Sequence, residues 1–429
     1  MSSFHLDLKR TYVPRRFERI EESMIKFIHA ADLHLDSPFS GLKSLPKKIV
    51  EMIQQSTFQS LATIVYSAIH NQVDFVVFSG DIYDLEDRSV KAQVQFKKEM
   101  ERLNKAKIPV YIIHGNHDFI GDEKLHLSLP ENVKVFDASV ETVRMTTKGG
   151  ESVAVSGFSY GERWITERMI TDYPKRHTQI DFHIGLLHGF QEGINSEHAR
   201  YAPFTLDELK EKGYDYWALG HIHVRSKVSD FPLAYYPGNI QGRNKKETGE
   251  KGYLMVELKK NASAEIEFYS SASIVWEKVV VDAVKLNDMD AIYKLIQESL
   301  PSIESAQFHY LISLELQVSE DIKDTLLKKI SQDQFIEAHH FFEDAQFIWI
   351  ANYKVSQIKS NHNDSDLQSL FPEAFQEVLS ELSEEEGFNE LTIDFFDQSK
   401  FSRILEERSV TYREEMIREA LSELRNQSI

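Results

Sequence analysis

The chain has 429 residues, 41% of them hydrophobic and 11% aromatic, so it can bury a sizeable core and is expected to form two or three domains. It has no cysteine, which excludes disulfides, thiolate zinc sites and thiol nucleophiles and leaves His, Asp and Asn as metal ligands. The net charge of −19 argues against simple nucleic-acid binding, which depends on Lys and Arg.

The negative charge is concentrated near the C-terminus. Residues 364–429 contain 17 acidic and 6 basic side chains, which is more than half of the excess. No apolar run reaches the roughly 18 residues of a membrane span, and the first 23 residues lack the apolar segment of a secretory signal. A cytoplasmic protein with no membrane association is therefore expected.

In the first part of the chain, short apolar runs alternate with amphipathic segments. Strands are predicted at residues 25–32, 73–81 and 108–118, and helices at residues 47–70 and 89–106. Ser89 is expected to cap the second helix. The later runs VKVFDASVETVRM, SVAVSGFSY, FHIGLLHGF, YDYWALGHIH and GYLMVEL predict strands with little helix between them. The pattern predicts an α/β fold with two stacked mixed β-sheets flanked by helices.

Near residue 271 the strand-rich region ends and predicted strands again alternate with helices. The runs VWEKVVVDAV, HYLISLELQV and FIWIANYKV alternate with helices predicted at 288–299 and from Asp321, which indicates a small α+β accessory domain over 271–358. A polar linker, KSNHNDSD, follows, and amphipathic helices are predicted from Leu367 to Leu382 and over 401–424. The main domain is therefore assigned to residues 24–270, and the linker with the C-terminal helices to residues 359–429.

Polar side chains follow five of the predicted strands at the point where each strand ends. They are Asp32 and His34, Asp81 and Asp84, Asn116 and His117, His188, and His221 and His223. Because ligands bind at the carboxyl ends of strands in open α/β sheets, these side chains are expected to converge. Mixed oxygen and nitrogen ligands suit divalent metals such as manganese. The set is larger than one ion needs, which favours two ions about 3.5–4 Å apart, an arrangement suited to in-line displacement at phosphorus.

The pair His221 and His223 lies two residues apart in the run GHIH. In an extended segment such residues face the same side, with Cα atoms about 6.5–7 Å apart. That separation suits one ligand for each of two ions better than two ligands for one ion. We therefore predict that the loss of either histidine empties a different metal site.

The motifs DxH, GDxxD, GNHD, GH and GHxH, in this order over residues 24–260, resemble the calcineurin-like metallophosphoesterase superfamily. Within it, the runs ADLHLDSPF, SGDIYD, YWALGHIH, YPGNIQGR and GEKGY are most similar to bacterial DNA repair exonucleases of the SbcD and YhaO type. The resemblance implies the metallophosphoesterase fold for the main domain. Members naturally start at the position of Met24, so residues 1–23 are expected to be an N-terminal extension without function.

The resemblance also implies a role for each strand-end residue. The first metal would be held by Asp32, His34 and His223, and the second by Asn116, His188 and His221, with Asp81 bridging both. His117 would be the catalytic residue, acting on the scissile phosphate or protonating the leaving oxygen. Asp84 stands where some relatives carry a histidine that contacts substrate, and it is predicted to bind substrate. Arg243 lies in a basic loop and is also predicted to bind substrate, although a solvated charged turn explains that loop equally well.

The function implied is a two-metal-dependent DNA nuclease, an exonuclease with endonuclease activity left open, that acts on double-stranded ends or hairpins in DNA repair. The expected cofactor is manganese, with magnesium and iron as alternatives. The expected partners are DNA and an SMC-like coiled-coil ATPase that docks on the C-terminal helices, and homodimerisation stays open. Two alternatives remain: a phosphoesterase for a nucleotide or other small phosphoester, and a non-catalytic adaptor with a structural metal site.

Overall fold

The computed structural model describes most of the chain. The described residues are 23–42, 45–84, 88–120, 126–193, 201–302, 308–343, 346–358, 372–384, 387–388 and 416–417. By packing, the chain divides into two compact units, one of residues up to Val318 with Ile322–Ser356, and one of Ser319–Asp321 with the residues from Gln357 onward. Among the described residues, no helix is both long and apolar enough to cross a membrane.

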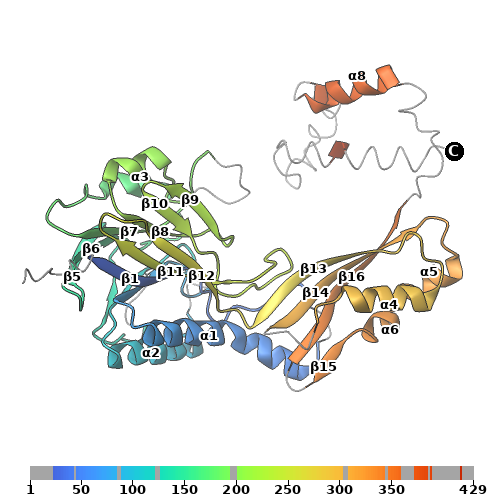
Figure 1. Cartoon of the computed structure of the whole chain (residues 1–429), viewed down its shortest axis with the longest axis horizontal. Helices are drawn as coiled ribbons and strands as arrows, with labels where there is room; N and C mark the ends of the chain where they lie inside the picture. The colour runs from blue at the N-terminus through green and yellow to red at the C-terminus, as the bar shows by residue number, and fades with distance from the viewer. Residues whose placement is uncertain are drawn as a thin grey trace, which may run out of the picture. The chain divides into compact units, whose positions relative to one another are not determined.

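The first sheet has six strands in the order β12-β11-β1-β2-β3-β4. These strands are β1 (Met24–Ala30), β2 (Phe75–Ser79), β3 (Val110–Ile113), β4 (Val133–Val135), β11 (Gly252–Lys259) and β12 (Glu265–Ser270). Strands β1 to β4 run parallel to one another, and β11 and β12 join antiparallel, so that the early blue strand β1 and the late yellow strand β11 lie side by side (Figure 1). The sheet is therefore mixed.

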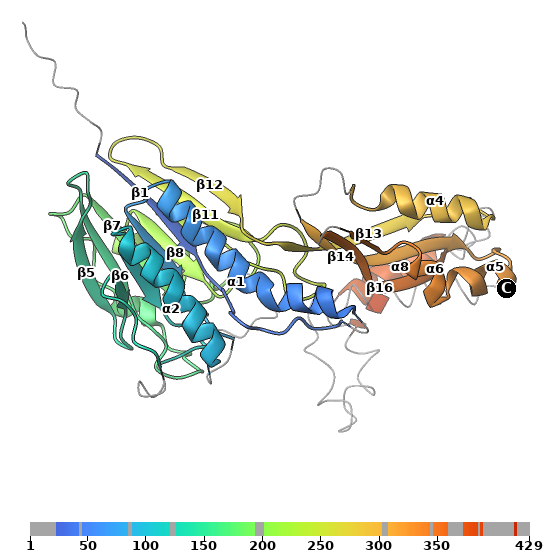
Figure 2. The ribbon, with the colours of Figure 1, turned by 90° about the horizontal axis from the view of Figure 1, so that it is seen from below.

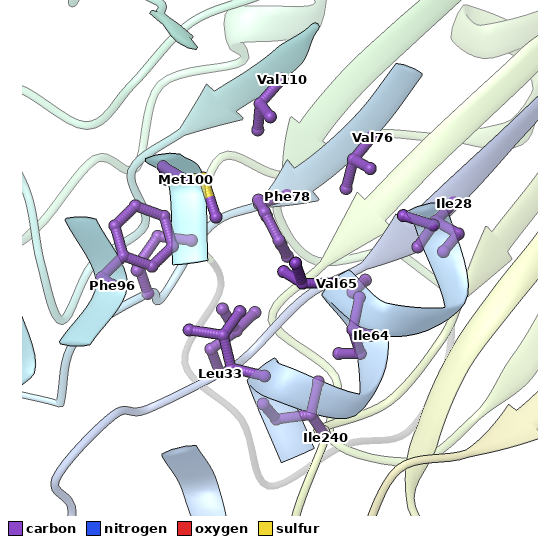
Figure 3. Close-up of a cluster of buried hydrophobic side chains, with 14 of the residues drawn as sticks. Ile28, Leu33, Ile64, Val65, Val76, Phe78, Phe96, Met100, Val110 and Ile240 are labelled. Atoms are coloured by element: carbon purple, nitrogen blue, oxygen red, sulfur yellow. The ribbon is translucent and has the colours of Figure 1, made fainter. Parts of the chain in front are cut away.

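Two helices cover one face of this sheet, α1 (Lys47–His70) and α2 (Val90–Lys105), and they lie next to each other (Figure 2). Helix α2 begins as predicted, because the Ser89 hydroxyl accepts a 3.0 Å hydrogen bond from the amide of Ala92. Phe78 of β2 packs against apolar side chains of both helices in a buried cluster (Figure 3). This cluster holds the helices on the sheet.

The second sheet has the order β5-β6-β7-β8-β10-β9. Its strands are β5 (Glu141–Thr146), β6 (Ser152–Gly157), β7 (Phe182–His188), β8 (Tyr216–Gly220), β9 (Ser226–Asp230) and β10 (Leu233–Tyr236), with the short helices η2 (Met169–Asp172) and α3 (Leu206–Lys212) beside it. The two sheets stack through a buried layer in which Phe27 stacks on Phe75 and meets Tyr216 of the second sheet edge-on. The predicted α/β fold with two stacked mixed sheets is confirmed.

A third sheet has four strands in the order β13-β14-β16-β15. The strands are β13 (Ile274–Asp282), β14 (His309–Ser319), β15 (Phe341–Glu343) and β16 (Gln346–Ile358), and the helices beside them are α4 (Met289–Ser299), α5 (Asp324–Ile330) and α6 (Asp333–Glu337). Ile292 and Ile296 of α4 pack on apolar residues of β14 and β16 in a cluster of their own. Strands and helices alternate here as the sequence predicts.

Near the C-terminus the structure describes one further helix, α8 (Pro372–Ser383), within the segment predicted to be helical from Leu367. Val378 of this helix is 53% exposed. The helix predicted over 401–424 lies outside the described residues apart from positions 416 and 417, and so do the linker at 359–366 and residues 1–22. The predicted domain boundaries and the predicted docking role of the C-terminal helices stay predictions.

Candidate metal centre

The predicted ligands gather at one edge of the two stacked sheets. Asp32, Asp81 and Asn116 follow β1, β2 and β3 of the first sheet, while His188 ends β7 and His221 follows β8 of the second. All five are buried. Neighbouring parallel strands end at the same edge of a sheet, and the stacked packing brings the two edges together.

The three residues predicted for the first metal form a compact group. The donor atoms of Asp32, His34 and His223 all lie within 4.8 Å of one another. The Nε2 atoms of the two imidazoles are 3.1 Å apart, and Nε2 of His223 is 4.0 Å from Asp32 Oδ1. The three side chains come from β1 and the segment after β8, which are separated by almost 190 residues along the chain.

The opposite ring nitrogens of these two histidines face carboxylates. His34 Nδ1 is 3.0 Å from Asp84 Oδ1, and His223 Nδ1 donates a 2.9 Å hydrogen bond to Glu247 Oε1. Because a carboxylate only accepts, the bond to Glu247 places a hydrogen on Nδ1 of His223, and the nearby Asp84 carboxylate favours the same tautomer for His34, which turns both Nε2 atoms toward the predicted metal position. Burial lowers the pKa of His34 to about 3, which keeps that ring neutral.

The two Nε2 atoms lie 3.1 Å apart, a separation at which they can share a hydrogen or bind the same metal ion. Two neighbouring ligands that are each about 2.1 Å from one metal ion are separated by roughly this distance. The donor set around His34 and His223, two imidazoles and the carboxylate of Asp32, therefore fits a divalent ion.

In the second group, too, a histidine Nε2 atom faces other predicted ligand atoms. His188 Nδ1 donates a 2.9 Å hydrogen bond to the carbonyl oxygen of Ser79, so its Nε2 faces two acceptors, Asn116 Oδ1 at 3.1 Å and Asp81 Oδ2 at 3.4 Å. The ring of His221 meets the ring of His188 edge-on, with centroids 5.3 Å apart. Burial lowers the pKa of His188, but the negative charge of Asp81 outweighs it and raises this pKa to about 9. A positive charge, as a proton or a metal ion, is therefore favoured at Nε2.

Asp81 lies between the two groups. Its Oδ2 is 3.7 Å from His34 Nε2 and 3.4 Å from His188 Nε2. Although burial acts in the opposite direction, the charge of His188 holds the pKa of Asp81 well below its ordinary value. An ionised carboxylate next to both groups has the geometry of a bridging ligand.

His117 stands beside the cluster without joining either predicted ligand set. Its backbone amide donates a 3.0 Å hydrogen bond to Asp81 Oδ1, and its Nδ1 donates a 2.9 Å hydrogen bond to the backbone carbonyl of Asp84. Its ring meets that of His34 edge-on, with centroids 5.0 Å apart. These contacts orient the ring and leave Nε2 available for proton exchange.

The two carboxylates that orient the first group are joined by one arginine. Arg243 Nη1 donates a 2.6 Å hydrogen bond to Asp84 Oδ1, and the Arg243 amide donates a 2.7 Å hydrogen bond to Glu247 Oε2. The arginine side chain is only 13% exposed. The substrate contacts predicted for Asp84 and Arg243 stay predictions. The geometry shows the Asp84 carboxylate between the guanidinium of Arg243 and the imidazole of His34.

Sequence reasoning overlooked Glu247. It lies in the run GRNKKETGEKGY, whose basic residues alone attracted interest. Glu247 also accepts a 3.0 Å hydrogen bond from Asn239 Nδ2, and its side chain is 11% exposed. Although burial opposes it, the hydrogen bond from His223 and the charge of Arg243 lower the pKa of Glu247 to about 2. The available signal was its position: Glu247 is one of two acidic residues in this run and lies between YPGNIQGR and GEKGY, the two stretches that carry the resemblance.

The backbone at the site is unusual. Asp32, His34, Asp81 and His221 have φ values of +52°, +43°, +51° and +103°. Non-glycine residues seldom adopt positive φ, which costs on the order of 1–3 kcal/mol and clusters at functional sites. The extended geometry expected for the GHIH run is therefore wrong, because β8 ends at Gly220 and the chain bends at His221. With this bend, the ring of His221 contacts the ring of His188, whereas the ring of His223 contacts the ring of His34.

Glycines allow the strand ends to approach this closely. A Cβ atom on Gly220 would overlap the carbonyl oxygen of Ser79 in the opposite sheet, and one on Gly115 would overlap the carboxylate of Asp81. The amide of Gly189 donates a 3.1 Å hydrogen bond to the Gly220 carbonyl. Only residues without a side chain fit at these two positions.

Comparisons with known proteins identify the family of the chain. Residues 25–225 match the model of the calcineurin-like phosphoesterase family. The chain is 36% identical to the metallophosphoesterase YhaO of Bacillus subtilis over 91% of this chain and 98% of that protein. It is 23% identical to the DNA double-strand break repair protein Mre11 of Thermoplasma acidophilum over 71% of this chain and 80% of that protein. A second protein of that name, from Archaeoglobus fulgidus, is 20% identical over 86% of this chain and 88% of that protein.

The match to YhaO extends over almost the whole length of both proteins, and the family model spans the strands that carry all the predicted ligands. The buried carboxylates and imidazoles at the strand ends provide candidate ligand groups for divalent metal. The chain belongs to the calcineurin-like metallophosphoesterase family and is a metal-dependent phosphoesterase.

Proposed function

We propose that this phosphoesterase is a two-metal-dependent DNA nuclease that hydrolyses phosphodiester bonds at double-stranded ends or hairpins in DNA repair. The proposed activity is that of an exonuclease, with endonuclease activity left open. Manganese is the proposed metal, because the donor set mixes carboxylate and amide oxygens with imidazole nitrogens.

One observation carries the phosphoester chemistry: Asp81 lies between two groups of ligands and also accepts the amide hydrogen of His117. A single carboxylate thus ties both predicted metal positions to the predicted catalytic imidazole. Two divalent ions, when bound, would activate a water and neutralise the charge that develops on the phosphate oxygens.

Side chains of the chain would provide the proton donor and the groups that orient the metal ligands. His117 Nε2 would donate a proton to the leaving oxygen as the phosphorus–oxygen bond breaks, while the attacking water bonds to phosphorus through its oxygen and releases a proton to solvent. Its Nδ1 is engaged by the Asp84 carbonyl, so the ring cannot turn away without losing that hydrogen bond. Asp84 and Glu247 keep the hydrogens of His34 and His223 on Nδ1 and so keep both Nε2 atoms free for the metal.

The choice of DNA is supported by the relatives. Two proteins named for DNA double-strand break repair match 71% and 86% of this chain. The charge of −19 weighs against a large electrostatic contribution to DNA binding. Because residues 364–429 hold more than half of this excess, the metal ions and local basic side chains would carry the contact with phosphate.

An SMC-like coiled-coil ATPase is the proposed protein partner, and it would bind the C-terminal helices. Helix α8 leaves Val378 half exposed, and on the solvent side it carries Glu377 and Glu381.

The proposal is tested by incubating the purified protein and manganese with labelled duplex DNA, hairpin DNA, nucleotides and phosphopeptides. Release of nucleotides from DNA, absent in Asp81→Asn, is expected. Turnover of nucleotides or phosphopeptides with no cleavage of any DNA would replace the nuclease with a small-phosphoester enzyme. A protein that binds metal yet hydrolyses none of these substrates would fit an adaptor with a structural metal site.

A further inference from the structure

An exposed tryptophan lies two ring contacts away from the candidate metal centre. The ring of Trp164 stacks on that of Tyr201, with centroids 5.5 Å apart and planes at 28°. Tyr201 in turn meets the ring of His221 edge-on at 5.3 Å. Tyr201 is 8% exposed and Trp164 is 61% exposed. Aromatic rings therefore form a continuous path from a predicted ligand to the protein surface.

The other three tryptophans are shielded. Trp217 and Trp276 are buried in apolar clusters, and Trp349 stacks against the ring of His340 at 3.7 Å. Trp164 alone among the four is mostly exposed, and an exposed apolar ring gains little from folding. Its position beside the metal centre indicates that it contacts something other than the core.

The surroundings of Trp164 suit a ligand with a flat ring and a negative charge. The guanidinium of the exposed Arg163 lies 5.4 Å from the centroid of the indole. Arginine binds phosphate oxygens, and an indole offers a π-face to a nucleobase. A nucleotide carries both features in one molecule.

We infer that Trp164 and Arg163 form a subsite that stacks the base of an unpaired nucleotide a few nucleotides from the scissile phosphate. The inference rests on the proposed nuclease function and specifies its substrate. Each of the two ring-to-ring steps is between one and two times the roughly 3.4 Å rise per nucleotide along a DNA strand. The subsite therefore lies within a few nucleotides of the metal centre.

This subsite explains how an acidic protein selects a DNA end. In a paired duplex both faces of a base are covered by its neighbours, so the indole can stack only on a base that is frayed, overhanging or in a hairpin loop. Stacking needs little positive charge and accepts every base. Trp164 thus recognises unpaired nucleotides at a DNA end.

Binding of labelled DNA in EDTA, where no cleavage occurs, tests the subsite. Trp164→Ala is expected to weaken binding of a duplex with a single-stranded thymidine overhang about 5- to 150-fold, the range for loss of one stacked base. The same variant is expected to bind a duplex with an abasic overhang as the wild type does, because that overhang keeps the phosphates and lacks the bases. Trp164→Phe is expected to retain most of the affinity.

Tyr66→Ala is the matched control. Tyr66 is also 61% exposed and also stacks on a neighbouring ring, that of His70, but it lies on α1 near the start of β2, at the opposite edge of the sheet. This variant is expected to bind both DNAs like the wild type. Equal affinity of wild type and Trp164→Ala for the thymidine overhang would overturn the inference, as would an equal loss on the abasic overhang.

Tryptophan fluorescence separates this inference from the nuclease proposal. Oligodeoxythymidylate added in EDTA is expected to quench the wild-type emission, and Trp164→Phe is expected to lose the quenching while it still binds. If the wild type cleaves no DNA, the nuclease proposal fails, and quenching that depends on Trp164 still supports a nucleobase subsite. Quenching that persists in Trp164→Phe places the base at another tryptophan and overturns the subsite.

Discussion

His223 donates a hydrogen bond of 2.9 Å from Nδ1 to the carboxylate of Glu247, which turns its Nε2 toward the predicted first metal position. The tautomer of the ligand is thus set by a residue that does not itself reach the ligand cluster. Outer carboxylates of this kind raise the basicity of the histidine and fix its ring. Glu247 therefore differs from its loop neighbours Lys245 and Lys246, which are exposed to solvent.

Glu247→Gln is expected to weaken metal binding about 10- to 100-fold, because the neutral amide no longer holds the hydrogen on Nδ1 of His223 with a full charge. Calorimetric titration with manganese measures the effect. Glu250→Gln, an exposed change in the same loop, serves as the control and is expected to bind like the wild type. Unchanged affinity in Glu247→Gln would refute this role.

Replacement of the histidine pair tests whether its members serve different ions. His221→Ala and His223→Ala are each expected to retain one manganese ion per chain, and the double variant none, as counted by elemental analysis after equilibration with the metal. If both rings held the same ion, the double variant would match the single ones. His70→Ala, which removes an exposed histidine of α1, is expected to keep the full metal content.

His117→Ala is expected to slow nucleotide release about 10²- to 10⁴-fold, the usual loss for a general acid. Metal content is expected to stay unchanged, since the amide of residue 117 and not its side chain bonds Asp81. The single-turnover rate on labelled duplex DNA, together with metal analysis of the same sample, measures both quantities. Loss of metal along with activity would make His117 a ligand and contradict its catalytic assignment.

Gly220→Ala is expected to lower the free energy of unfolding by about 1–3 kcal/mol and to abolish tight metal binding, because the added methyl group would collide with the Ser79 carbonyl across the sheets. Urea denaturation and manganese titration provide the two measurements. Gly249→Ala adds a methyl group in open space at a φ of +76°, so it is expected to cost about 1 kcal/mol and to leave metal binding intact. Normal metal affinity in Gly220→Ala would show that the sheets can separate there without harm.

Local patterns predicted much of the fold. Ser89 caps α2 as expected, because capping depends on residues three positions apart. The alternation of strands and helices indicated the stacked sheets, since the apolar period reports which face of an element is buried. The bend at His221 was not predicted, because its φ of +103° is imposed by the close approach of Gly220 to Ser79 and not by neighbouring residues.

The sequence by itself determined which donor groups this protein has and where they stand, at strand ends that the fold class brings to one edge. Only the tertiary structure decided which nitrogen of each histidine faces the cluster, since that depends on Asp84, Glu247 and the Ser79 carbonyl. It also decided that Trp164 stands two rings from His221. The physical reason is that hydrogen-bond direction and ring stacking join residues far apart in the chain, whereas motifs record only neighbours along it.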